Sequence, residues 1–229
     1  MSRSLFTFLL IPLFFAACSP NNVTVDDSLQ KYFDSAGVKG SFGFFDNGQG
    51  HFTVYNLSRY RDSLYQPAAT FDILQSLIAI QTGVNRRIGK DTLKKWIDSL
   101  QYGNKNIGSD TTAFWENNQL KINSDEQLGL LKKLYFDQLP FYQRPQQLVR
   151  NLFLSEATSN YRLTYKTGQG IKEDGHAIGW VMGWVEENKH PYFFVVNLES
   201  ADSTRDLSDA GLTIAKGILK QLGFFQGKK

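Results

Sequence analysis

One stretch decides the fold of this chain: QPAATFDILQSLIAIQTG, residues 66–83. Its apolar residues at helical spacing are Phe71, Leu74, Leu77 and Ile78, and Ile73, Ala79 and Ile80 extend them around most of the circumference. A helix that is apolar nearly all round is buried, so we predict a central helix inside the core. We expect Thr70 to cap its N-terminus and Gly83 to end it.

The first residues have the pattern of an export signal. Arg3 gives a short positive region, residues 5–15 are an apolar core too short to span a bilayer, and Ala16 and Ala17 precede the only cysteine, Cys18. This resembles a bacterial lipoprotein signal, which implies that Cys18 is lipidated; the alternative is an ordinary secretory signal with a bystander cysteine. We therefore expect a signal over residues 1–18, a tether over 19–25 and a single domain over 26–225. That protein would be anchored by lipid in the bacterial cell envelope and face the periplasm.

Composition excludes several function classes. The chain is 41% hydrophobic, enough for a sizeable core, and its charges are scattered with a net charge of +3, so nucleic-acid binding gets little support. The histidines His51, His176 and His190 are widely separated, and no glycine-rich phosphate loop is present. We expect neither a metal nor a cofactor.

The remaining pattern predicts helices and strands in an α+β arrangement. We expect helices over residues 26–36, 90–100, 123–138, 146–154 and 206–222, and strands over 39–45, 51–56, 161–167, 177–186 and 192–198. Asn123 and Glu126 have the spacing of a capping box at a helix start. Trp180 and Trp184 should share one face of their strand. The order of elements fits helices that cover an antiparallel sheet.

Four segments, in this order, resemble the class D (oxacillinase-type) serine β-lactamases and the related sensor and penicillin-binding domains. They are residues 67–83, Tyr102-Gly103-Asn104, Tyr165-Lys166-Thr167-Gly168 and residues 179–186. In that family the central helix reads Pro-Ala-Ser-Thr-Phe-Lys, and Tyr-Gly-Asn and Lys-Thr-Gly border the substrate cleft. The resemblance implies the penicillin-recognising (β-lactamase/transpeptidase-like) fold. It also implies a shortened helical subdomain, because residues 84–101 leave no segment for the family's Ser-x-Val motif.

Both reactive residues of the family are replaced here. The family serine forms an acyl-enzyme and the lysine one helical turn later takes its proton, but these positions are Ala69 and Asp72. Ala69 has no nucleophilic atom, and Asp72 has no amine to carry the family's carbamate. Thr70 follows directly, but one helical step turns it about 100° away. We therefore expect no intact catalytic residue and interpret the chain as a pseudoenzyme.

The resemblance leaves a relic cleft of six residues: Tyr102, Gly103, Asn104, Lys166, Thr167 and Gly168. We expect it to bind a β-lactam or a peptidoglycan peptide non-covalently. Lys166 and Thr167 would hold a carboxylate, and Gly168 would let the ligand approach the strand closely. It is equally open that Lys166 is a solvated strand residue. A Tyr-Gly-Asn sequence more commonly forms an ordinary turn than a cleft wall.

Two other functions stay open at this point. The chain could be a residual β-lactam hydrolase that uses Asp72 as a base or a nucleophile not yet identified. It could also be a protein-interaction scaffold of the envelope with an unknown partner. Arg205, near the start of the last helix, is not in clear register with the arginine that binds the substrate carboxylate in many members of the family.

Overall fold

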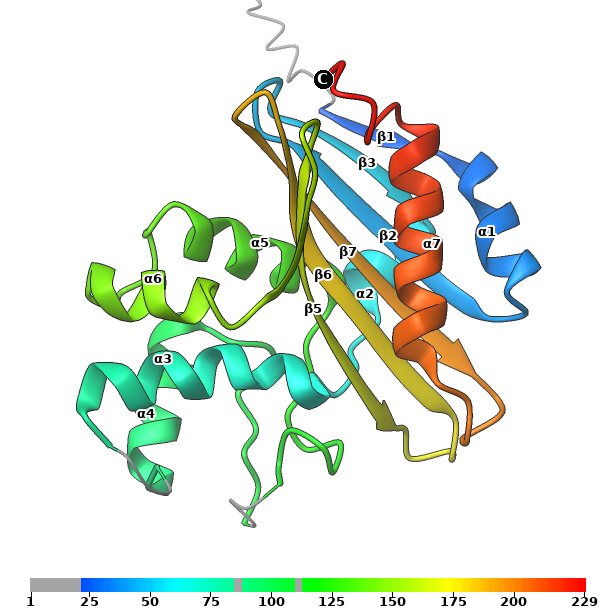
Figure 1. Ribbon diagram of the computed structural model, residues 1–229. Helices are drawn as coiled ribbons and strands as arrows, with labels where there is room; N and C mark the ends of the chain where they lie inside the picture. Colours follow the sequence, from blue (N-terminus) through cyan, green and yellow to red (C-terminus); the bar gives the residue numbers. More distant parts are fainter. Residues whose placement is uncertain (1–21, 85–87, 110–112) are drawn as a thin grey trace, which may run out of the picture.

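The structure is a computed structural model that describes residues 22–84, 88–109 and 113–229. Its strands are β1 (Val23–Val25), β2 (Lys39–Asp46), β3 (His51–Tyr55), β4 (Leu154–Ala157), β5 (Arg162–Ile171), β6 (Ala177–Glu187) and β7 (His190–Ser200). Its α-helices are α1 (Gln30–Ser35), α2 (Leu57–Asp62), α3 (Asp72–Thr82), α4 (Lys90–Leu100), α5 (Ser124–Tyr135), α6 (Gln143–Arg150) and α7 (Leu207–Gln221), with short 3₁₀ turns η1 (Asp27–Leu29) and η2 (Ala68–Phe71). Figure 1 shows α1 and α7 on one face of a single sheet and α3 to α6 on the other. The predicted α+β fold is confirmed.

The sheet has seven strands in the order β1-β3-β2-β7-β6-β5-β4. Every neighbouring pair is antiparallel except β1 and β3, which are parallel, so the sheet is mixed and not purely antiparallel as predicted. Residues 23–25, which we predicted as the end of the tether, form β1, and Val23 lies opposite Phe52. Val23, Thr24 and Val25 are three β-branched residues in a row, which favours a strand over an extended tether.

Two further elements differ from the prediction. Helix α2 was not predicted, and the Asn56 side chain caps it by accepting from the Arg59 N–H. The predicted helix over residues 146–154 ends at Arg150, and Leu154 already begins strand β4. Both elements are short, so the apolar pattern over so few residues does not separate helix from strand.

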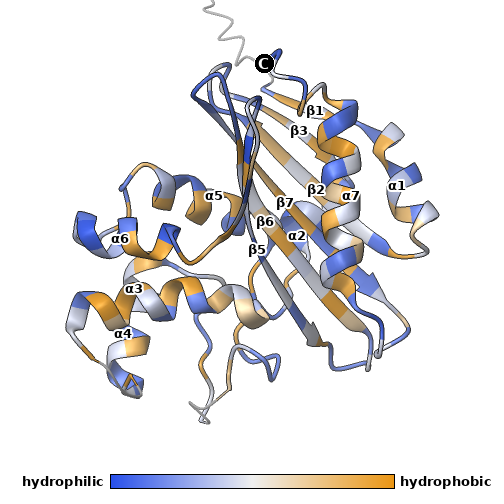
Figure 2. Cartoon of the chain, viewed as in Figure 1, coloured by the Kyte–Doolittle hydropathy of each residue, from blue (hydrophilic) through white to orange (hydrophobic). Residues whose placement is uncertain are grey.

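The two faces of the sheet carry separate cores. On β6, the alternate residues Trp180, Met182 and Trp184 pack toward α3, while Val181 and Val185 pack toward α7. This confirms that Trp180 and Trp184 share a face. Figure 2 shows the apolar residues concentrated along the central strands, as expected where both faces of a sheet are covered.

Helix α3 is buried on the side that packs against α4 and α6. Leu74, Leu77 and Ile78 are fully buried, but Ile80 is 38% exposed, so the prediction of burial all round is wrong for the far half. Gly83 ends the helix at a φ of +69°, as predicted. Thr70 is not its N-cap, because η2 precedes the helix and Phe71 occupies that position.

The predicted capping box of α5 is confirmed. The Asn123 side chain accepts from the Glu126 N–H at 2.8 Å, and the Glu126 carboxylate accepts from the Asn123 N–H at 3.2 Å. Across the described ranges, no helix is both long and apolar enough to cross a membrane.

Candidate functional site

The site lies where η2 packs against the outer edge of β5. Strand β4 pairs with β5 only as far as Tyr165, so from Lys166 onward η2 takes the place of a neighbouring strand. At Gly168, a Cβ atom would lie 2.9 Å from the backbone nitrogen of Thr70. The glycine is therefore needed where the chain's own backbone approaches β5 closely.

The turn at residues 68–70 holds no nucleophilic side chain at position 69. Ala68 has a φ of +48°, which is a strained conformation for a residue other than glycine. Its N–H donates to the Trp115 carbonyl at 3.0 Å, and this bond holds the turn. The next residue, Ala69, is partly exposed but carries only a methyl group.

Thr70 is turned into the core. Its side chain is 1% exposed, and its hydroxyl donates to the Pro67 carbonyl at 2.6 Å. The same hydroxyl accepts from the Gln127 amide at 2.8 Å. With both functions occupied, this hydroxyl does not reach the site, as the helical geometry predicted.

Asp72 and Lys166 form an ion pair across the site. The Lys166 Nζ donates to Asp72 Oδ2 at 2.9 Å, from β5 to the first turn of α3. The Asp72 side chain is 49% exposed and that of Lys166 26%, so water reaches both groups. The sequence analysis missed this pair, although the acidic and basic residues both occupy positions that the family lines its cleft with.

A pocket of about 370 Å³ opens beside this ion pair. Its walls are α3, the end of α6 with the segment that follows it, and β5; they contribute Asp72, Ser76, Val149, Leu152, Phe153 and Lys166. Ser76 lies one helical turn beyond Asp72 and supplies a hydroxyl that the sequence analysis did not single out. The pocket thus combines one carboxylate, one ammonium and an apolar wall.

The Tyr102-Gly103-Asn104 motif does not line this pocket. The Tyr102 ring is 3% exposed and packs edge-on against Phe71, and burial raises the pKa of its hydroxyl above the usual value. Gly103 has a φ of +52°, and Asn104 Oδ1 accepts from the N–H groups of Asn106 and Lys121. In this structure the motif makes a turn, and Tyr102 lines a separate pocket between α4 and α5.

Thr167 and Arg205 are also turned away from Lys166. Neighbouring strand residues point to opposite faces, and Tyr165 and Gln169 of β5 pack toward α7, so Thr167 belongs to that face. The Arg205 guanidinium donates to the carbonyls of Ala36 and Gly37, just after α1. Of the six predicted binding residues, Lys166 and Gly168 lie beside the family's catalytic positions: Lys166 contacts Asp72, and Gly168 lies next to Ala69.

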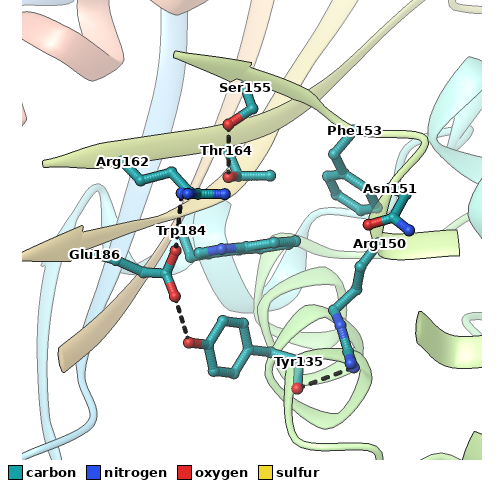
Figure 3. A pocket seen from close by; sticks show the side chains of 9 residues that line it. All are labelled: Tyr135, Arg150, Asn151, Phe153, Ser155, Arg162, Thr164, Trp184 and Glu186. Atoms are coloured by element: carbon teal, nitrogen blue, oxygen red, sulfur yellow. Dashed lines mark hydrogen bonds and ion pairs between the residues drawn. The ribbon is translucent and has the colours of Figure 1, made fainter. Parts of the chain in front are cut away.

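A second pocket, of about 490 Å³, adjoins the first at Phe153 (Figure 3). Trp184 lies at its centre, with Arg162 and Thr164 on one side and Tyr135 on the other. The Tyr135 hydroxyl donates to Glu186 at 2.6 Å, and burial together with this bond raises the pKa of Tyr135. Most polar groups that line this second pocket are therefore paired with one another.

His176 lies in a cluster of charged side chains. Its ring lies 2.8 Å from Glu199, and Asp174 completes a group whose ligand atoms lie within 4.8 Å of one another. The Lys172 ammonium binds both carboxylates at 2.8 Å. This group is thus an ion-pair network in which Lys172 already holds the place of a cation. Cys18 lies outside the described residues.

Known proteins share this architecture. The family model described as the penicillin binding protein transpeptidase domain matches residues 83–222. The β-lactamase OXA-20 of Pseudomonas aeruginosa is 30% identical over 236 residues, which cover 84% of this chain and 86% of that protein.

Solved structures agree with the family match. A class D β-lactamase from Nostoc superposes with a TM-score of 0.77 at 28% identity, covering 86% of this chain and 99% of the other. The C-terminal domain of the Bacillus licheniformis BlaR penicillin receptor gives a TM-score of 0.81 at 23% identity, covering 90% and 98%, and supports the fold. These matches show that the chain belongs to the class D β-lactamase and penicillin-binding transpeptidase family.

Proposed function

We propose that this protein is a non-catalytic, penicillin-recognising lipoprotein of the bacterial cell envelope. The observation that carries the proposal is the replacement of the nucleophile by Ala69 together with the Asp72–Lys166 ion pair. Acyl transfer needs a nucleophile within hydrogen-bond reach of a base. At this site the position for the nucleophile holds a methyl group, and the carboxylate that could act as the base is paired with an ammonium.

The inherited ligand class is a β-lactam or a peptidoglycan peptide, bound without a covalent step. The pocket beside Lys166 supports this, because an ammonium with further N–H groups can bind a carboxylate. The N-terminal pattern supports lipid attachment at Cys18 and a periplasm-facing domain. Because β1 begins at Val23, the tether between the lipid and the sheet is at most the few residues that precede this strand.

The test is intact-mass spectrometry of the chain from Ser19 after incubation with penicillin, beside the A69S/D72K double variant. We expect the natural sequence to show no acyl adduct and the double variant to gain one penicillin mass. That result would mean that the pocket still recognises the ligand and that only the reactive groups are lost. An adduct on the natural sequence would overturn the proposal, and peptide mapping would then name the nucleophile.

One observation favours a second candidate, a residual hydrolase. Ser76 and Asp72 line the same pocket, one helical turn apart, so a hydroxyl and a carboxylate are available there. This candidate predicts slow turnover of a chromogenic β-lactam that is lost in both S76A and D72N. Turnover that is absent, or equal in all three proteins, excludes it.

A further inference from the structure

The pocket beside α3 is lined by an ion pair, with Asp72 from α3 and Lys166 from β5. We propose that it binds a small zwitterion, a free amino acid or short peptide whose ammonium binds Asp72 and whose carboxylate binds Lys166. The inference rests on the non-catalytic function proposed above and narrows its ligand class. The residue on which the inference mainly depends is Asp72. Where the family has a lysine, this chain has a carboxylate, and a carboxylate can bind an amine.

Both charged groups keep unused hydrogen-bonding capacity. Of the three N–H groups of the Lys166 ammonium, one donates to Asp72 Oδ2. Among the residues that the structure describes, Lys166 is the one side-chain partner of the Asp72 carboxylate, whose other oxygen can accept from a ligand. A zwitterion can therefore add two charge-assisted hydrogen bonds without displacing the internal pair.

Charge balance favours a zwitterion over an ion of either sign. The Asp72–Lys166 pair has no net charge, so a ligand that is only an anion is attracted by Lys166 and repelled by Asp72 at nearly the same distance. A ligand that is only a cation is attracted by Asp72 and repelled by Lys166. A zwitterion oriented against the pair gains both attractions.

The other walls suit the body of such a ligand. Val149 at the end of α6, with Leu152 and Phe153 just after it, lines the same pocket as the ion pair, and Leu152 is 63% exposed. An apolar ligand side chain that covers Leu152 would remove apolar surface from water, which favours binding. The volume of about 370 Å³ is suited to one or two amino-acid residues.

The experiment is titration calorimetry with alanylalanine, in D,D and L,L forms, at neutral pH. Each form is compared with its N-acetyl derivative, which lacks the ammonium, and with its C-terminal amide, which lacks the carboxylate. We expect the free dipeptide of at least one form to bind about fivefold or more tightly than either derivative, as about 1 kcal/mol per half-exposed ion pair implies.

Variants assign each charge to its residue. D72N should abolish the preference over the N-acetyl dipeptide, and K166M should abolish the preference over the amide. K121M removes a comparable ion pair, with Glu173, outside the pocket and should leave both preferences unchanged. Circular dichroism of each variant confirms that it is folded.

The outcomes separate this inference from the proposed function. Equal binding of the free and N-acetyl dipeptides would overturn the inference, since the pocket would then recognise the carboxylate alone, while the non-catalytic function would stand. Absence of binding by every dipeptide at its solubility limit would also overturn it. Acylation of the natural sequence by penicillin would instead overturn the proposed function.

Discussion

At the scale of single residues, Glu199 of β7 is a mostly buried carboxylate with three cationic or imidazole partners. Its oxygens accept hydrogen bonds from Lys172, His176 and Arg59 at 2.8–2.9 Å, and its side chain is 10% exposed. Burial alone would raise the pKa of Glu199, but these three partners outweigh it and lower the pKa to about 2. The network ties α2 to the β5–β6 connection and to β7.

We expect E199Q to lower the free energy of unfolding by about 2–4 kcal/mol at neutral pH, because it leaves cationic partners unpaired in a mostly buried position. Urea denaturation measures this. E173Q breaks the ion pair between Glu173 and Lys121, which is more exposed than the Glu199 network, and should cost about 1 kcal/mol or less. Equal effects of the two substitutions would contradict the ranking.

The same carboxylate makes stability depend on acid. Because the pKa of Glu199 is depressed in the folded state, its contribution is complete above the ordinary carboxyl pKa of about 4.3 and is lost as pH falls toward 2. The stability difference between the natural protein and E199Q should therefore shrink over that range. Denaturation curves recorded at successive pH values test this, and a difference that stays constant would argue against the assigned pKa.

At the scale of elements, the close packing of η2 against β5 depends on Gly168, which has no side chain. G168A should destabilise the protein by about 1–3 kcal/mol, because its methyl group would press on the backbone of Thr70. G129A is the matched control, since nothing lies within 4 Å of the added methyl in α5. There the same change should stabilise by about 0.5–1 kcal/mol. Thermal unfolding of both variants checks the opposite signs.

The start of α5 gives a second prediction at this scale. N123A removes the capping-box acceptor and also the bond from the Asn123 amide to the Arg61 carbonyl, so we expect a loss of about 1–2 kcal/mol. N123S keeps the capping oxygen and should recover most of that loss. If N123S were as unstable as N123A, the bond to Arg61 and not the cap would be the main contribution.

At the scale of the whole molecule, the two cores share the central strands and should unfold together. All four tryptophans lie in or against the core on the α3 face, whereas Ile218 of α7 is fully buried in the other core. We expect I218A to cost about 2–5 kcal/mol. Tryptophan fluorescence and far-UV circular dichroism should shift by the same amount, because unfolding is cooperative. Separate transitions would show that the two layers unfold independently.

The sequence alone determined the family, the α+β fold, the capping box at Asn123, the end of α3 at Gly83 and the loss of the nucleophile at Ala69. These depend on local periodicity, turn chemistry and the order of motifs along the chain. Only the tertiary structure decided that Lys166 pairs with Asp72, 94 residues away, that Tyr102 is buried, and that residues 23–25 join the sheet. Such contacts depend on how strands and helices align in space, because neither the register of η2 against β5 nor the direction of a side chain across that seam is contained in a local pattern.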